Sequence, residues 1–341
     1  MLTILIILFL SFAPMLLYAF FLWWLDRYEK EPWLLLAFSF FWGALPAVIL
    51  SVILELLFDI PNTAFASNHT LIYNLLGGAV TAPLVEESLK AVAVLGLLIF
   101  FPREIDSPID GVIYGGMAGF GFAAVENLLY FITAYGDGGL IGTFWLAFLR
   151  AGVFGLNHAM YTGFTGLGIA LALEYRQRWF RWLLPPLGLS LAVFIHAYHN
   201  TLATFWSHLE NGASLFVAII SDWSGVLLLI LVAIWARWLE QGRLVAFLNS
   251  QAATYQIPAE ELAILISPRQ REKMRWQALF RGNFQQWFRL GRYFQLITEA
   301  AFSWHRAGQG DVKSAADLGE IAVRLREVQG QVTSLKSKVV G

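Results

Sequence analysis

The chain has no cysteine among its 341 residues. This absence excludes thiol catalysis, disulfide bonds and thiolate metal sites, although it does not decide the compartment. Charge is also scarce, because Asp, Glu, Lys and Arg make up 14% of the residues, whereas soluble domains carry about 25%. Hydrophobic residues account for 58%, and the mean hydropathy is +0.61. Sparse charge and long apolar runs together predict a polytopic helical membrane protein.

The same apolar runs disfavour two other interpretations, a β-barrel fold and a cleavable signal peptide. A transmembrane β-barrel is disfavoured because the apolar runs are continuous and do not alternate with polar residues. A cleavable signal peptide is disfavoured because the first run, Leu2 to Leu25, is too long and no basic residue precedes it. That run ends in Trp23, Trp24 and Asp26, which is typical of a membrane interface. We therefore interpret it as the first transmembrane helix.

Seven membrane spans can be drawn along the chain. Their ranges are residues 2–25, 33–58, 71–101, 111–134, 141–173, 182–206 and 213–239. Lys and Arg fall in alternate connections, which by the positive-inside rule predicts N-out/C-in topology. The third and fifth spans are long, so we expect them to be tilted or broken, with a kink at Pro83 after the loose Gly77-Gly78 pair. The predicted fold class is an all-α, polytopic transmembrane helix bundle with a cytosolic helical C-terminal tail.

The amino-acid composition of the chain changes after residue 239. Fourteen of the 23 Lys and Arg fall in residues 240–341, against nine acidic residues, and aromatic residues interleave with Arg there. We therefore expect two domains: a transmembrane helical bundle at 1–239 and a cytosolic, basic, amphipathic helical tail at 240–341. This composition is typical of an appendage lying partly on an anionic membrane surface. No nucleic-acid-binding module is recognisable, so no nucleic-acid partner is expected.

Acidic and imidazole side chains recur at one depth in four of the predicted spans. They are Glu86 and Glu87, Glu126, His158, and His196. All lie roughly 20–25 Å from a helix end at 1.5 Å per residue, which is near mid-membrane. A carboxylate or imidazole at this depth is costly, and for Asp, Lys or Arg the cost is roughly 2.5–3.5 kcal/mol on insertion scales. Glu and His are also the ligands of hydrolytic metal centres, so the pattern predicts an intramembrane metal-dependent hydrolase.

Neighbouring residues refine this prediction around the paired glutamates. Glu86 and Lys90 share a helix face at i,i+4, so Lys90 can hold Glu86 ionised, while Glu87 can meet another partner. The alternative to a catalytic site is that these charged residues form an internal ion pair whose only role is to hold helices together. Small residues from Gly115 to Ala124 would let a neighbouring helix approach Glu126 closely.

The two histidine segments leave further alternatives open. Glu126 can instead bond only to Arg150 or Tyr114, and a lone His158 is often a hydrogen-bonded core residue. His196 shares one helix face with His199 and Asn200, so either histidine could be the ligand. Asn200 can hold a water or an oxyanion by hydrogen bonds.

Three charged residues receive structural interpretations. Arg150 and Glu55 are taken as the remaining charges within the spans, outside the central level, where they snorkel or pair. Asp110, at the start of the fourth span, is interpreted as an N-terminal helix cap.

A set of short motifs in a fixed order resembles PrsW-type intramembrane proteases, within the wider group of CAAX-processing and bacteriocin-processing membrane proteases. The resemblance covers about residues 26–206. It rests on Glu29-Lys-Glu-Pro-Trp33, Val85-Glu-Glu-Ser-Leu-Lys90, Asp110-Gly-Val-Ile-Tyr-Gly115, Gly121-Phe-Ala-Ala-Val-Glu-Asn127, Asn157-His158 and His196-Ala-Tyr-His-Asn200. The tail is not explained by it.

The resemblance implies a glutamate-assisted, zinc-dependent peptide hydrolase of a bacterial plasma membrane. Glu86 and Glu87 match the glutamates of an EExxK motif, Glu126 matches an FxxxE motif, and His158 and His196 match separate histidines. Some relatives cleave membrane-anchored anti-sigma factors, which implies a membrane-anchored protein substrate. One distant branch is a non-catalytic scaffold, so the motifs alone do not guarantee hydrolysis.

The mechanistic hypothesis divides the roles as follows. Glu126, His158 and His196 bind the metal, or bind a polarised water together with Asn200. Glu86 takes the proton from that water, and Asn200 supports the oxyanion. Glu87 is counted with the catalytic residues, because with Lys90 it orients Glu86. Asn127 and His199 are expected to support the site.

Two other function classes compete with hydrolysis. A non-catalytic scaffold or receptor would use the Glu and His residues only for interhelical bonds. A proton-coupled transporter would use them as a relay, although the chain lacks the half-to-half match of an inverted repeat. The reaction, if hydrolytic, requires a hydrated cavity between the helices. The oligomeric state is not predicted.

Overall fold

The computed structural model describes the chain except for residues 26, 27, 29, 67–69, 103, 176, 210, 211 and 341, together with the side chains of 59–66 and 332–340. All regular structure in the described part is helical, so the predicted all-α class is confirmed. The chain divides into two compact units. The membrane unit comprises Met1–Leu25 and Glu31–Ile234, and the C-terminal unit comprises Asp26–Lys30 and Trp235–Gly341. The functional division at residue 239 stays a prediction.

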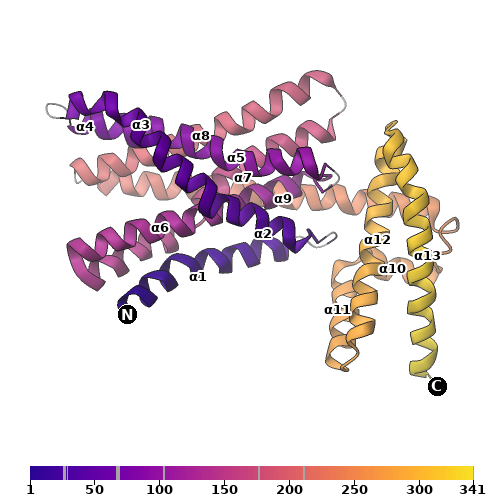
Figure 1. Ribbon diagram of the computed structural model, residues 1–341. Coiled ribbons are helices and arrows are strands. Elements are labelled where there is room, and N and C mark those ends of the chain that lie inside the picture. The colour runs from indigo at the N-terminus through magenta and orange to yellow at the C-terminus, as the bar shows by residue number, and fades with distance from the viewer. Residues whose placement is uncertain are drawn as a thin grey trace. The chain divides into compact units, whose positions relative to one another are not determined.

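The membrane unit is a bundle of long helices, two of which are interrupted by π-helical turns and one of which ends in such a turn (Figure 1). The first half of the unit contains α1 (Leu2–Leu25), α2 (Trp33–Trp42), turn η1 (Gly43–Ala47), α3 (Val48–Ala66), α4 (Thr70–Asn74), turn η2 (Leu75–Thr81) and α5 (Ala82–Phe100). The second half contains α6 (Pro108–Ala147), turn η3 (Phe148–Val153), α7 (Asn157–Glu174), α8 (Arg178–Leu209) and the first part of α9 (Gly212–Gln251).

Five helical stretches of the described residues are long and apolar enough to cross a membrane, judged by length and composition. They are Leu2–Leu25, Trp33–Phe58, Pro108–Glu174, Arg178–Leu209 and Gly212–Gln251. The fourth and fifth predicted spans both fall in the third stretch. Helix α5 is not among the five, and it carries three charged residues within its 19. A polytopic helical bundle is therefore supported, whereas the number seven and the N-out/C-in orientation stay predictions.

The interruption predicted near Pro83 takes the form of the π-helical turn η2, which contains the Gly77-Gly78 pair and ends just before α5. Pro83 lies in the first turn of α5, directly after η2. A π turn widens the backbone and exposes its carbonyl groups, and such turns are frequent at functional sites. The chain is therefore deformed just before the helix that carries Glu86 and Glu87.

The expectation that the fifth span, 141–173, is tilted or broken is confirmed. Gly139 has φ of 62° and ψ of −155°, a conformation open to glycine, and interrupts α6 at this residue. The following segment returns along α6 and ends after η3, and residues 154–156 are not helical. Helix α7 therefore begins at Asn157, and His158 lies in its first turn rather than in mid-helix.

Helices α6 and α7 touch through their backbones. A Cβ atom built on Gly111 would lie 2.1 Å from the carbonyl oxygen of Gly166, and one built on Gly119 would lie 2.3 Å from that of His158. Only glycine permits such close contact. The prediction that small residues bring a neighbouring helix close to Glu126 is thus confirmed for α7, which carries His158.

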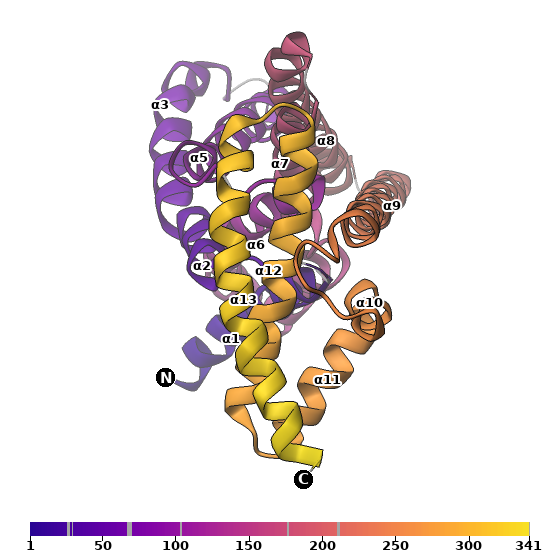
Figure 2. The same cartoon turned by 90° about the vertical axis from the view of Figure 1, so that its right-hand side faces the viewer.

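The C-terminal unit is helical and has its own hydrophobic core. It contains the end of α9, α10 (Ala259–Ile266), α11 (Pro268–Phe280), α12 (Phe284–Gly308) and α13 (Val312–Val340). Helices α12 and α13 lie side by side in both views (Figure 1 and Figure 2). Leu265, Ile297 and Leu325 are completely buried in this core, and Tyr28 from the short N-terminal segment joins it.

Candidate metal and catalytic site

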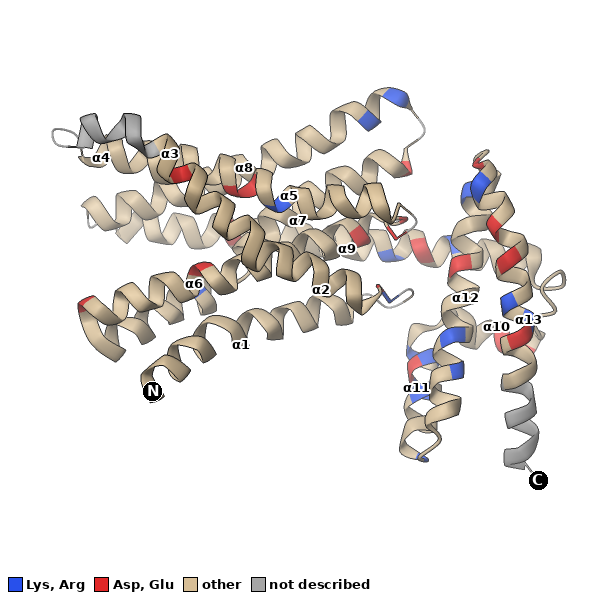
Figure 3. Cartoon of the chain, viewed as in Figure 1, with Lys and Arg blue, Asp and Glu red and all other residues tan. Residues whose placement is uncertain are grey.

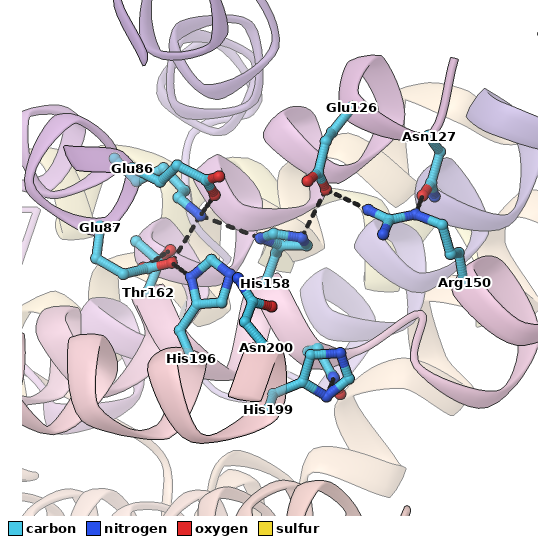
Figure 4. A network of polar contacts seen from close by, with 12 residues as sticks. Glu86, Glu87, Glu126, Asn127, Arg150, His158, Thr162, His196, His199 and Asn200 are labelled. Atoms are coloured by element: carbon cyan, nitrogen blue, oxygen red, sulfur yellow. Dashed lines mark hydrogen bonds and ion pairs between the residues drawn. The ribbon is translucent and has the colours of Figure 1, made fainter. Parts of the chain in front are cut away.

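Four of the predicted site residues come together between three helices. Glu86 and Glu87 belong to α5, His158 to α7 and His196 to α8 (Figure 4). Each offers one oxygen or nitrogen atom, and these four atoms all lie within 4.8 Å of one another. The helices thus gather two carboxylates and two imidazoles, which is a donor set suited to a transition metal such as zinc.

Lys90 stands among these donors. Its Nζ atom donates to Glu87 Oε1 at 2.6 Å and to Glu86 Oε2 at 3.2 Å, and it lies 3.1 Å from His158 Nδ1. The ammonium is completely buried and lies 4.0 Å from the centre of the Phe122 ring. The pairing of Lys90 with Glu86 predicted from their spacing is therefore confirmed, and Lys90 also neutralises Glu87.

The two adjacent glutamates have different surroundings. Glu87 is fully buried, and it accepts hydrogen bonds from the Thr162 hydroxyl at 3.0 Å and from His196 Nδ1 at 2.9 Å. Glu86 borders a cavity of the membrane unit. The expected separate partner of Glu87 is thus found, and of the two carboxylates it is Glu86 that can meet a molecule entering the cavity.

Glu126 lies on the far side of the His158 ring. Its Oε2 atom is 2.9 Å from His158 Nε2, and it accepts a hydrogen bond from Arg150 Nη2 at 2.5 Å. Arg150 Nε donates to the Asn127 side chain at 2.9 Å, so Asn127 supports the arginine (Figure 4). Glu126 is therefore not one of the four clustered donors. The alternative partner Arg150 does pair with it, whereas Tyr114 bonds to Glu31.

The hydrogen bonds of His158 determine which ring nitrogen carries a proton. An ammonium group can only donate, so Nδ1 accepts from Lys90. In a neutral imidazole the proton then lies on Nε2 and is donated to the Glu126 carboxylate. The Nδ1 lone pair consequently faces the four-donor cluster.

A second polar group surrounds His199. Its Nδ1 atom lies 2.6 Å from Asp222 Oδ2, which also accepts from the Asn157 amide at 2.9 Å. Asp222 comes from α9 and is 1% exposed. The interpretation of Arg150 and Glu55 as the remaining charges within the spans is therefore wrong, because it overlooked Asp222. A single acidic residue inside the apolar stretch 213–239 was the signal that could have identified it.

Asn200 connects α8 to the deformed turn before α5. Its side-chain amide donates to the carbonyl oxygen of Gly78 in η2 at 2.7 Å. The backbone carbonyl exposed by the π turn thereby gains a partner. Support of an oxyanion by Asn200 stays a prediction. The observed hydrogen bond also gives this residue a structural role, because it links α8 to η2.

A cavity of about 760 Å³ opens beside these groups. Its lining includes Glu86, Glu126, His158, His196, His199 and Asn200. Glu55 and Arg150 also line it, so both face the same space rather than only the lipid. Residues from α3, η2, α6, η3, α8 and α9 complete the wall. The expected cavity between the helices is therefore present.

Two of the remaining motif residues anchor the helix ends. Ser107, not Asp110, is the N-cap of α6, and Asp110 is the third helical residue of a capping box, accepting from the Ser107 amide at 2.7 Å. The N-cap interpretation of Asp110 is thus wrong by three positions. Glu31, from the first motif, accepts a hydrogen bond from Tyr114 of α6, whereas Glu29 lies outside the described residues.

Comparison with known proteins bears on this arrangement. A family described as "PrsW family intramembrane metalloprotease" matches residues 31–238. A protein named Protease PrsW from Clostridioides difficile (strain 630) is 34% identical over 121 residues, which is 36% of this chain and 48% of that protein. The similarity therefore spans about half the length of the relative. No solved structure matches the chain.

Proposed function

Because the chain belongs to the PrsW family of intramembrane metalloproteases, we propose that it hydrolyses peptide bonds of membrane-anchored proteins in the cavity of the membrane unit. The observation that carries this proposal is the convergence of Glu86, Glu87, His158 and His196, of which all but Glu87 line that cavity. Neither a packing role nor a lipid contact requires two imidazoles and two carboxylates to meet inside an apolar bundle.

The donor set fits a metal ion by its chemistry. Two imidazole nitrogens and two carboxylate oxygens match the ligands that zinc takes in hydrolytic enzymes. His158 Nδ1 and the Glu86 and Glu87 oxygens now face the Lys90 ammonium, which is itself a cation. These atoms are therefore arranged to bind positive charge, and Lys90 has to withdraw or lose a proton when a metal enters.

The roles of the ligating residues follow from their hydrogen bonds. We assign His158 and His196 as ligands, with Glu87 accepting from His196 Nδ1 and leaving its Nε2 for the metal. Glu126 then holds His158 through its Nε2 proton. This gives Glu126 an orienting role instead of the ligand role predicted from depth alone. Zinc, when bound, would acidify a water molecule and polarise the scissile carbonyl.

Glu86 is the proposed general base. It borders the cavity, whereas Glu87 is fully buried behind it. Glu86 can take a proton from the attacking water and return it to the leaving amine. Lys90 donates a hydrogen bond to this carboxylate at 3.2 Å. Asn200, which lines the same cavity, has a second amide hydrogen for the developing oxyanion.

The proposed substrate is a membrane-anchored protein, and an anti-sigma factor is the specific class that the family resemblance suggests. The cavity lies among apolar helices, so a substrate segment must reach it from within the bilayer or its surface. A cavity of about 760 Å³ accommodates a short unwound stretch of peptide and not a folded domain.

Metal content is the first test. Wild-type protein purified in detergent under metal-replete conditions should hold about one zinc ion per chain, and the His158→Ala/His196→Ala variant should lose it. Loss of zinc together with loss of cleavage supports the proposal. A folded wild type without bound metal would exclude the metalloprotease mechanism and favour the scaffold class, since Lys90 already neutralises the cluster.

A further inference from the structure

The C-terminal unit contains a helical hairpin whose tip is unusual for a water-exposed surface. Helices α11 and α12 are joined by Arg281, Gly282 and Asn283, with Gly282 at φ of 70°. The side chain of Asn283 accepts from the Gln286 amide at 3.0 Å and caps α12. The turn is therefore well defined, and both helices end at one tip.

Four large aromatic residues are exposed beside this turn. Trp276 and Phe280 lie one helical turn apart on α11, and Phe284 and Phe288 lie one turn apart on α12. Their exposed fractions are 52%, 83%, 68% and 63%. We call these four residues the aromatic tip. The opposite sides of the same helices bury Ala278 and Leu290 in the core, so the aromatic tip lies outside that core.

Basic residues surround the aromatic tip. Arg269, Lys273, Arg281 and Arg292 are exposed. Residues 268–292 contain seven Lys and Arg and one acidic residue, Glu272. Figure 3 shows this excess of basic charge along α11 and the adjoining part of α12. Aromatic rings flanked by cations match the boundary between lipid headgroups and acyl chains.

We propose that the aromatic tip inserts into the headgroup region of a membrane containing anionic lipid, with the surrounding cations contacting phosphate groups. The unit is attached to a candidate membrane span through the continuous helix α9, so a bilayer is always near it. A second copy of the chain fits this face poorly because both tips would carry the same charge. The inference is independent of the proposed proteolysis, since it concerns residues beyond the family match.

The absence of cysteine provides a direct experiment. The full-length Phe280→Cys variant, labelled with an environment-sensitive fluorophore, is placed in nanodiscs at one chain per disc. We expect a blue-shifted emission and quenching by brominated lipid in discs of mixed phosphatidylcholine and phosphatidylglycerol. Both effects should weaken in phosphatidylcholine alone or in 1 M salt, where charges are screened beyond about 3 Å.

Two further variants make the test specific. Val323→Cys on α13 is 68% exposed in the same unit and serves as the matched control, whose emission should not depend on the lipid. Arg281→Glu in the Phe280→Cys background should lower the docked-to-undocked ratio about fivefold or more.

Three results would overturn the inference. The first is a Phe280 label that stays water-exposed in anionic discs. The second is equal insertion in both lipids, which would remove the role of the cations. The third is a shift that requires two chains per disc, which would identify a second copy as the partner.

Discussion

Glu86 and Glu87 are adjacent in sequence, yet their surroundings separate their roles. Glu86 faces the cavity, and Glu87 is enclosed by Lys90, Thr162 and His196. A glutamine at either position keeps the size of the side chain and removes the negative charge. The two substitutions should therefore affect the protein differently.

Glu86→Gln should lower cleavage at least about 100-fold, because the proposed base is lost, while the melting temperature in detergent changes little. Glu87→Gln should lower stability strongly, since breaking a buried ion pair costs about 3–5 kcal/mol. Cleavage assays and thermal melts of both variants check these two predictions. Cleavage retained by Glu86→Gln would contradict its assignment as the base.

Asp222 should prove important for stability although it lies outside the four-donor cluster. Asp222→Ala leaves Asn157 and His199 without their common acceptor, and an orphaned buried donor costs roughly 1–3 kcal/mol. A lowered melting temperature in detergent is the expected result. Asp137→Ala is the matched control, because Asp137 is an exposed acidic residue on α6, and it should stay within about 0.5 kcal/mol. Equal effects of the two substitutions would refute this role.

At the residue scale, the spacing of residues along one helix predicted a contact correctly. The direction in which a side chain faces a distant helix could not be predicted. The contact between Glu86 and Lys90 follows from helix geometry and was predictable. The position of Glu126 on the far side of His158 was not, because depth along a helix says nothing about which face meets a neighbour. Asp222 was missed for a simpler reason: it is isolated in an apolar run and has no charged neighbour in sequence.

At the scale of helices, the contact between α6 and α7 places His158 relative to Glu126. The backbones meet at Gly111 and Gly166, where a Cβ on Gly166 would lie 1.8 Å from the opposite carbonyl oxygen. Side chains cannot relieve an overlap between backbone atoms. The two helices are therefore expected to behave as one rigid element.

Gly166→Ala should destabilise the protein by about 1–3 kcal/mol through overpacking and should also reduce cleavage, because α7 carries His158. Gly96→Ala provides the control within the bundle, since its Cβ has no atom within 4 Å, and alanine favours a helix by up to about 1 kcal/mol. Thermal melts and cleavage rates of both variants make the comparison. A Gly166→Ala protein as stable as the Gly96→Ala protein would refute the close packing.

Helices were predictable from apolar runs, but their interruptions were only partly so. A kink near Pro83 was predictable from Pro83 and the Gly77-Gly78 pair, although its form as a π turn was not. A break in the fifth span was also expected, but its place at 154–156 was not predictable, because glycines are spread from Gly136 to Gly155 and no single one marks the end of a helix. The break matters because it begins α7 one residue before His158.

At the scale of the whole molecule, the C-terminal unit is assembled from two distant chain segments. Tyr28 is 7% exposed in its core, and its backbone carbonyl accepts from the Thr298 hydroxyl at 3.3 Å. The guanidinium of Arg271 lies 5.7 Å from the Tyr28 ring. Burial lowers the pKa of Arg271 to about 10, so this arginine remains charged at neutral pH beside the ring. The sequence alone does not predict this assembly, since nothing near Tyr28 resembles the tail.

Tyr28→Ala should therefore loosen the C-terminal unit. Removal of a buried aromatic side chain typically costs about 3–5 kcal/mol, and hydrogen exchange in α11 and α12 should accelerate. Tyr28→Phe keeps the ring and loses only the 3.4 Å contact of its hydroxyl with the Ile266 carbonyl, so it should exchange like wild type. Unchanged exchange in Tyr28→Ala would show that residues 235–341 are stable without the N-terminal segment.

The close spacing of Glu86, Glu87 and Lys90 also bears on how the chain is made. All three charges belong to one helix and pair within a single turn, at i,i+3 and i,i+4. Their neutralisation therefore does not need to wait for α7 or α8 to be synthesised. As α5 leaves the ribosome it can enter the bilayer with one uncompensated charge instead of three, which lowers the cost of insertion. The lysine thus helps to carry Glu86 and Glu87 into the membrane before the rest of the site exists.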